Sequence, residues 1–516
     1  MSGQVAFNNM AADIRTPLFF AEVNAGVPPY SGVSRTLLFC RKLPGGTAVP
    51  GKAIPLGSID PNILGGPGSM LADMALYARW RNPTGAIWLM PMADPAGGVQ
   101  ATDTITITGP ATASGQLVRY VAGERYQATV AQGDSAATIA ANLAAAINNG
   151  YTKYNRRMLS CVVATATGGV VTLTARHTGV EGNLIRVEAG LDGDEFDPAG
   201  LTVAIASTNL TGGSGAVDFA GALAALGSEP FDWMTGPYAS VANIAAMRAF
   251  LSDSGSGRWS PSIGLNGHYI TANDGNLIAQ TVLGATLNDR HLTVLATNAY
   301  PAPLWCWLAA LTGAVGLSKN LGAPLTSAIE IARPMQTVGL DGLRPPSSVS
   351  NKWGLADRQA LYQSGMSALT FAPDGTATID RVLTTYQTNS YGVPDTTFLG
   401  IETISIAAYV KQYLKLRVTS TYPRCVLRDD NPNGIQGVAT PDGIKATLVH
   451  AYTELDQIGG VVENTDLFAK YLIVNRSSDP NRVDAYLPTD VANQFIVFAA
   501  NITIFPELTD AIASLQ

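Results

Sequence analysis

The chain has 516 residues, which is more than one hydrophobic core usually supports, so its length predicts several domains. Hydrophobic residues make up 47% and charged residues 14%, a balance that favours packed cores with surfaces covered by other protein and disfavours a disordered chain. The net charge of −7 lacks the basic excess that direct nucleic-acid binding requires, and the 52 glycines and 30 prolines predict many turns and a large share of β structure.

The amino-terminal segment is apolar, but it lacks the basic stretch before an apolar run that marks a secretory signal. Synthesis in the cytoplasm is therefore expected. Apolar residues at a chain end must be covered, because leaving them in water costs free energy. The segment is predicted to dock on another surface through Phe7, Ile14, Leu18, Phe19 and Phe20.

Residues 69 to 90 predict a helix followed by a buried strand. Ser69 is a favourable N-cap, the run MLADMALYARWR has apolar residues at helical spacing, and Asn82-Pro83 ends the pattern. The apolar run AIWLM then reads as a strand. Turn-rich residues 94 to 98 mark a joint where a separate unit is expected to begin.

Between residues 98 and 211 apolar and polar residues alternate with period two in TDTITITG, QLVRYVAGERYQATV and CVVATATGGVVTLTAR. Gly168-Gly169 suits a two-residue hairpin turn. Asp134 is predicted to cap a helix that ends at Gly150. The order β-β-α-β-β predicts a compact β-rich domain inserted into a larger one.

After residue 219 strands and helices alternate, in FDWMTGPY, VANIAAMRAFLSD, SIGLNGHYITA, NLIAQTVLGATL and HLTVLATN. Such alternation is typical of a parallel α/β sheet. The uncharged stretch between Arg290 and Lys319 is long enough to span a membrane. Asn298, Pro301 and Pro303 divide it, however, so a buried strand and helix are favoured and no membrane insertion is expected.

The last third predicts an α+β domain. It begins with a hairpin that turns at Asp374-Gly375 and continues with the helical run ETISIAAYVKQYLKLRV. A second helix is predicted to open at Thr440-Pro441, a cap followed by a first-turn proline. The runs AKYLIVNR and RVDAYLP are then predicted as strands.

The uncharged run FIVFAANITIF near the carboxyl end has strong β propensity. An exposed strand of this kind aggregates unless it is paired. Two interpretations stay open: an internal strand of the last domain, or a strand exchanged with neighbouring subunits. The residues predicted to link subunits at this end are Phe495, Ile496, Val497, Phe498, Ile502 and Ile504.

Motifs for catalysis or cofactor binding are missing from the sequence. There is no phosphate loop and no G-x-S-x-G elbow, and GGPGSM lacks the spacing of a dinucleotide-binding loop. The acidic loop LDGDEFDP could offer carboxylates to calcium, but Phe196 stands where an EF-hand needs oxygen, so a solvated loop is favoured. The four scattered cysteines are expected to be free thiols. No catalytic, cofactor-binding or metal residue is assigned, and the chain is not expected to be an enzyme.

Several long motifs resemble the tail sheath proteins of Mu-like contractile phages. They are FNNMAADIRTPLFFAEVN at the amino end, GSMLADMALYARWRNPTGAIWLMPMAD, and the C-terminal runs RVLTTYQTNSYGVPDTTFLGIET, VATPDGIKATLVHAYTELDQIGGVVENTDLFAKYLIVNR and DPNRVDAYLPTDVANQFIVFA. The resemblance covers nearly the whole chain except residues 98 to 211.

This resemblance implies a structural subunit of the virion tail that is assembled in the host cytoplasm. It implies stacked six-fold rings around a tail tube, contraction that drives the tube through the host envelope, and strand-exchange arms at both ends. The implied partners are copies of the chain itself, the tail tube protein, and baseplate and tail terminator proteins. A baseplate component is the first alternative, and an α/β enzyme with a pocket at the carboxyl ends of the strands is the second.

The predicted architecture combines a parallel α/β core, an inserted β-rich domain, a C-terminal α+β domain and two terminal arms. The predicted boundaries are 1–24 for the amino-terminal arm, 25–97 plus 212–368 for the α/β core, 98–211 for the insertion, 369–494 for the C-terminal domain, and 495–516 for the C-terminal arm.

Overall fold

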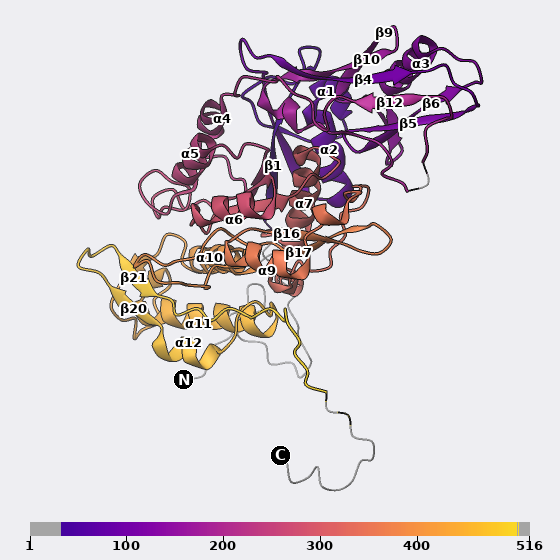
Figure 1. The fold of residues 1–516 in the computed structure, drawn as a ribbon. Helices are drawn as coiled ribbons and strands as arrows, with labels where there is room; N and C mark the ends of the chain where they lie inside the picture. The colour runs from indigo at the N-terminus through magenta and orange to yellow at the C-terminus, as the bar shows by residue number, and fades with distance from the viewer. Residues whose placement is uncertain (1–31, 194, 503, 505–516) are drawn as a thin grey trace, which may run out of the picture.

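The computed structural model describes residues 32–193, 195–502 and 504 (Figure 1). Its centre is a six-stranded sheet with the order β15-β14-β13-β1-β3-β2. All neighbours are parallel except β2, which is antiparallel to β3, so the predicted parallel sheet is confirmed. The strands are β1 (Arg35–Arg41), β2 (Ile54–Pro55), β3 (Ala86–Met92), β13 (Trp233–Thr235), β14 (His268–Asp274) and β15 (Leu292–Thr297).

Helices cover both faces of this sheet. Successive side chains of a strand point to opposite sides, so a strand that is apolar throughout must be covered on both faces. Leu38 and Cys40 of β1 belong to the hydrophobic core that includes helices α2 (Met70–Arg81) and α7 (Leu304–Ser318). Leu37 and Phe39 belong to the core on the other face, beneath α4 (Phe219–Leu226), α5 (Val241–Leu251) and α6 (Leu277–Ala285). The fold is therefore mixed α/β.

Helix α7 explains the uncharged stretch before Lys319. Nearly all of its residues are buried, with α2 on one side and β1, β13 and β14 on the other. A helix that is apolar all round belongs in the centre of a protein. Within the described part of the chain, no helix is both long and apolar enough to cross a membrane.

The segment between β3 and β13 is rich in strands and contains one long helix, as predicted, but its order is more complex than β-β-α-β-β. QLVRYVAGERYQATV is a hairpin of two strands that turns at Ala122-Gly123, and a further short hairpin follows the helix. The helix cap is Ser135, not Asp134; the Ser135 hydroxyl accepts from Thr138 N, whereas Asp134 accepts from Ala131 N.

The elements of this segment form two main sheets, in the orders β12-β4-β10-β9 and β11-β5-β6. They are β4 (Gln100–Thr108), β5 (Gly115–Val121), β6 (Glu124–Val130), α3 (Ala136–Asn149), β7 (Tyr151–Lys153), β8 (Arg156–Met158), β9 (Val162–Thr167), β10 (Val170–Thr178), β11 (Val187–Glu188) and β12 (Thr202–Ile205). The predicted hairpin turn at Gly168-Gly169 joins β9 to β10.

The C-terminal part lies at the opposite end of the molecule from the inserted segment (Figure 1). Its predicted hairpin at Asp374-Gly375 and both long helices are confirmed, including the Thr440 cap with Pro441 in the first turn. Residues 469–471 were predicted as strand but form the last turn of a helix. The elements are α9 (Leu355–Gln363), β16 (Ala368–Phe371), β17 (Ala377–Arg381), α10 (Ile401–Thr421), β18 (Val426–Leu427), β19 (Val438–Ala439), α11 (Pro441–Gln457), α12 (Thr465–Tyr471), β20 (Ile473–Arg476) and β21 (Val483–Tyr486).

We propose the sequence-derived boundaries as the domain division of the chain. The bridge between Val99 and Ser214 brings the two ends of the insertion together, as expected for an inserted domain. The insertion is not loosely attached, however. One continuous hydrophobic core contains both its helix residues, such as Leu143, and residues of α2 and α7.

Candidate inter-subunit surface

The C-terminal run leaves the body of the protein as an extended, unpaired segment (Figure 1). Val491 makes the last β-bridge, with Val462, and the described residues after it belong to no strand. The internal-strand interpretation of FIVFAANITIF is therefore wrong for its described residues, 495–502 and 504, because no strand of the same chain pairs with them. Phe495, Val497, Phe498, Ile502 and Ile504 are 75–86% exposed, while Ile496 is half-buried.

The predicted linkage residues at the other end are Phe7, Ile14, Leu18, Phe19 and Phe20, and they lie outside the described residues. Their role in linking subunits stays a prediction.

An apolar groove with a volume of about 630 Å³ lies between α10, α11 and the β20–β21 hairpin. Side chains three or four residues apart on α10 form its floor, since such residues share one helix face. The apolar residues that line it include Val410, Leu414, Val418, Ile444, Leu448 and Val483. Such a groove is shaped to take an apolar segment.

The β20–β21 hairpin at this groove is a sheet of only two strands. Two-stranded sheets are marginal by themselves, and their edges present backbone groups that an added strand can bind. Val483 and Ala485 of β21 face the groove, whereas Tyr486 is exposed. The groove and the edge beside it together suit an extended apolar strand.

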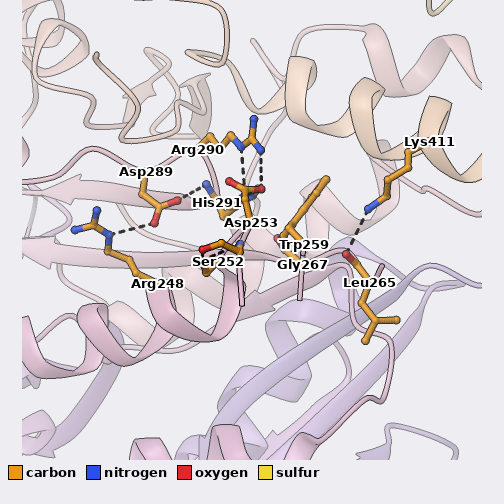
Figure 2. Close-up of polar contacts among 11 residues, drawn as sticks. Arg248, Ser252, Asp253, Trp259, Leu265, Gly267, Asp289, Arg290, His291 and Lys411 are labelled. Carbon is orange, nitrogen blue, oxygen red and sulfur yellow. Dashed lines mark hydrogen bonds and ion pairs between the residues drawn. The ribbon is translucent and has the colours of Figure 1, made fainter. Parts of the chain in front are cut away.

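A polar cluster connects this C-terminal part to the α/β core (Figure 2). The Lys411 ammonium of α10 lies 4.2 Å from the centre of the Trp259 ring and donates to the Leu265 carbonyl at 3.4 Å. Trp259 stacks on His291, with 4.6 Å between ring centres. His291 in turn binds the Asp253 carboxylate through Nε2 at 3.1 Å.

Charges in this cluster are balanced by short contacts. Burial raises the pKa of Asp253, but hydrogen bonds from His291 and from Arg290, which lies 2.6 Å away, outweigh it and lower that pKa to about 2. Burial and, to a smaller extent, Lys415 lower the pKa of Lys411 to about 8. Lys411 holds α10 against the core by its cation–π contact and hydrogen bond, and the stacking and ion pairs join the core residues behind Trp259.

An α/β sheet of this order would bind a ligand where neighbouring connections leave in opposite directions, at the carboxyl ends of β1 and β13. Side chains of the same chain fill that position. The Arg41 guanidinium at the end of β1 is 1% exposed and lies 3.5 Å from Asp94 and 3.3 Å from Glu181. Tyr238, which follows β13, is also buried.

The start of α2, in GGPGSM, is likewise occupied from within the chain. His177 Nε2 accepts from Met70 N at 3.0 Å, so its Nδ1 donates to Asp94 at 2.6 Å. The Ser69 hydroxyl accepts from Ala72 N at 3.1 Å. Two of the amides that would bind an anion at this helix start therefore already have partners.

Asp73 is a fully buried carboxylic acid between α2, α7 and the insertion. It accepts from Trp305 Nε1 at 3.2 Å and from the Tyr151 hydroxyl at 3.4 Å. Burial is the largest influence and raises its pKa to about 7, assisted by the charge of Glu124 and opposed by that of Lys153. The acid therefore changes charge near neutral pH at the contact between insertion and core.

Replacing Asp73 by Asn is expected to flatten the dependence of stability on pH. The pKa is about 7 when folded and near 4 when unfolded, so between these values the folded state keeps a proton that the unfolded state loses. Wild-type stability should fall as the pH rises from about 4 to about 7 because of this group. The measurement is the midpoint of urea unfolding at pH 5, 6, 7 and 8, with the exposed Asp430→Asn as control. Parallel curves for wild type and Asp73→Asn would contradict the assignment.

The acidic loop LDGDEFDP is not simply solvated, as the sequence favoured. Asp197 forms a two-pronged ion pair with Arg119, at 2.7 and 2.8 Å, and Glu195 binds Arg125 at 2.6 Å. Arginine partners occupy oxygens that a calcium ion would need. Among the described residues, no three His, Cys, Asp or Glu side chains are placed to hold a metal ion. All four cysteines are free thiols, as predicted.

The fold and these surfaces define a mixed α/β protein whose ligand crevice is filled from within, with an apolar groove and an exposed apolar run in its C-terminal part. Residues 212–385 match the model of the phage tail sheath protein central domain, and residues 393–505 match that of the phage tail sheath C-terminal domain. The Mu-like prophage FluMu tail sheath protein of Haemophilus influenzae is 30% identical over 507 residues, covering 96% of this chain and 98% of the relative. The chain belongs to the phage tail sheath protein family, a family of virion structural proteins, and the resemblance predicted from its motifs is confirmed.

Solved structures are also similar. The sheath tail protein of Desulfitobacterium hafniense is 15% identical, with 92% of this chain and 97% of that chain covered and a TM-score of 0.48. The sheath tail protein of Listeria innocua is 13% identical, with 90% and 93% covered and a TM-score of 0.47. The contracted helical sheath of the anti-feeding prophage is 12% identical, with 96% and 99% covered and a TM-score of 0.44.

Proposed function

We propose that this chain is the subunit of a contractile tail sheath. Copies polymerise as stacked hexameric rings around the tail tube, and contraction drives the tube through the host envelope. The observation that carries the proposal is the exposed apolar run at 495–504 in a chain that also holds an apolar groove and a free two-stranded sheet. An exposed strand and a site that fits it, on the same molecule, generate a polymer when each copy supplies its strand to the next.

The mechanism stores free energy in the packing of subunits. The extended sheath is a metastable arrangement of the same subunits that the contracted sheath packs more favourably. The arms keep neighbours linked while the rigid cores rotate. Contacts such as Lys411 on Trp259 hold each C-terminal part to its own core, so the movement takes place between subunits. The other partners are the tail tube protein and the baseplate and terminator proteins, with assembly in the host cytoplasm.

Negative-stain electron microscopy of the purified protein, expressed alone, tests the proposal. The expected result is long hollow cylinders with a regular helical repeat, in the contracted form because no tube is present as a template. Monodisperse monomers at all concentrations would contradict the proposal and favour a baseplate component.

Removing residues 1 to 20 is expected to give a folded protein that no longer forms cylinders. The reason is that Phe7, Ile14, Leu18, Phe19 and Phe20 are proposed to dock on a neighbouring subunit. Circular dichroism checks the fold and electron microscopy checks assembly. Normal cylinders from the shortened chain would exclude the amino-terminal arm as a link.

A further inference from the structure

The charged residues of the apolar groove are distributed unevenly along its length. Of the described residues that line it, the charged ones are Lys411 and Lys415, both on α10. The α10 residues in the lining extend from Thr403 to Val418, which is about 22 Å along a helix that rises about 1.5 Å per residue. Lys411 lies near the middle of this span and Lys415 lies toward Val418, whereas no charged residue lines the Thr403 end.

The two lysines differ in how their charges are used. The Lys411 ammonium is held over the Trp259 ring. Lys415 is exposed, and none of the ion pairs between described residues includes it. An ammonium group beside an apolar groove, with no carboxylate partner of its own chain among the described residues, favours an occupant that carries negative charge.

The C-terminal sequence has the complementary pattern. After Asp490 the only charged residues are Glu507 and Asp510, and no Lys, Arg or His occurs. The apolar run 495–504 comes first and the acidic residues follow it. An extended strand advances about 3.3 Å per residue, so about seven residues of the run span the groove along α10. The acidic residues then lie beyond one end of the groove.

We propose that Lys415, supported by Lys411, sets the direction in which the C-terminal run of a second copy lies in this groove. The run 495–504 lies in the groove with its carboxyl end toward Val418, so Glu507 and Asp510 follow at the end of the groove that is nearer to Lys415. The opposite direction would place both carboxylates at the neutral Thr403 end and leave Lys415 without a partner. The inference rests on the proposed function, because it assumes that copies exchange this run.

Direction matters for a strand that links subunits. An uncharged apolar strand can bind a groove and a sheet edge in either direction with similar burial of apolar area. A regular helical polymer needs the same direction in every copy, since its link must repeat with one rotation and rise. Attraction between these opposite charges adds specificity to binding that the apolar residues supply.

The test is charge reversal with rescue. Lys415→Glu is expected to reduce polymer recovered by high-speed sedimentation by about tenfold, because like charges then meet at the end of the groove. Combining Lys415→Glu with Glu507→Lys and Asp510→Lys is expected to restore wild-type recovery. The matched control is Lys470→Glu, an exposed lysine on α12 outside the groove lining, which should polymerise as wild type does.

Each outcome decides the matter. Wild-type recovery from Lys415→Glu, or no rescue by the opposite reversals, would overturn the proposed direction.

Deletion of residues 493–516 in the same assay separates this inference from the proposed function. If that deletion abolishes polymer while Lys415→Glu does not, arm exchange stands and its direction is not set by charge. If the deletion leaves polymer intact, the arm itself is excluded and the inference falls with it. Circular dichroism of each variant shows that it is folded.

Discussion

A chain that ends at residue 492 is expected to be folded and unable to form cylinders. The Val462–Val491 bridge and the hydrogen bond from Ala492 N to the Val461 carbonyl remain in that chain. The described residues beyond Gln494 take part in no strand, so the deletion removes little from the folded subunit. It removes the exposed apolar run that is proposed to enter a neighbour, and several such side chains are worth about 1.5–3 kcal/mol each when buried.

Sedimentation velocity and electron microscopy measure this result. A sharper variant is Val497→Pro, which removes one backbone donor from a strand and is tolerated poorly inside a sheet. Its matched control is Val497→Thr, which keeps the donor and β propensity. Loss of cylinders with proline and their retention with threonine would indicate that backbone pairing makes the link. Cylinders formed by the chain that ends at 492 would exclude the C-terminal arm.

Replacing Arg41 by Met is expected to lower the free energy of unfolding by about 3–5 kcal/mol. The guanidinium is buried and lies within 3.5 Å of Asp94 and 3.3 Å of Glu181. It also donates to the Thr178 carbonyl of the insertion. Removing it leaves two carboxylates without their cation in a region where burial already raises the pKa of Glu181.

The chain that ends at 492 is the right background for this measurement, because polymerisation would otherwise add to apparent stability. Urea unfolding gives the free energy. The double variant Arg41→Met with Glu181→Gln should lose less than Arg41→Met alone, since one unpaired charge is removed with its partner. A loss below about 1 kcal/mol for Arg41→Met would contradict the role assigned to these ion pairs.

The motion proposed for the sheath depends on which contacts stay fixed within a subunit. Arg41 joins the insertion to the core, and the stack of Lys411, Trp259 and His291 joins α10 to the core. Both contacts are formed by charged side chains that are held by neighbours on other elements. They favour subunits that move as single bodies, and the run at 495–504 is proposed to supply the movable links.

The sequence by itself determined the features that neighbours in the chain control. The helix start at Thr440-Pro441, the hairpin at Gly168-Gly169 and the alternation of strands and helices after residue 219 were all predicted correctly. Caps, turns and apolar periodicity depend on residues a few positions apart, so they can be read locally. The long motifs also identified the family.

Only the tertiary structure decided the contacts between residues far apart in sequence. The choice of Ser135 over Asp134 as cap is a local exception, because the backbone geometry decides which of the two side chains reaches the amide of Thr138. The pairing of Arg41 in the sheet's crevice with Glu181, and of the α2 start with His177, requires the insertion to fold back onto β1 and α2. The groove that is lined by both Lys415 and Val483 joins elements separated along the chain. Burial and pairing of these groups follow from packing, and local sequence patterns carry no record of which distant side chains will meet.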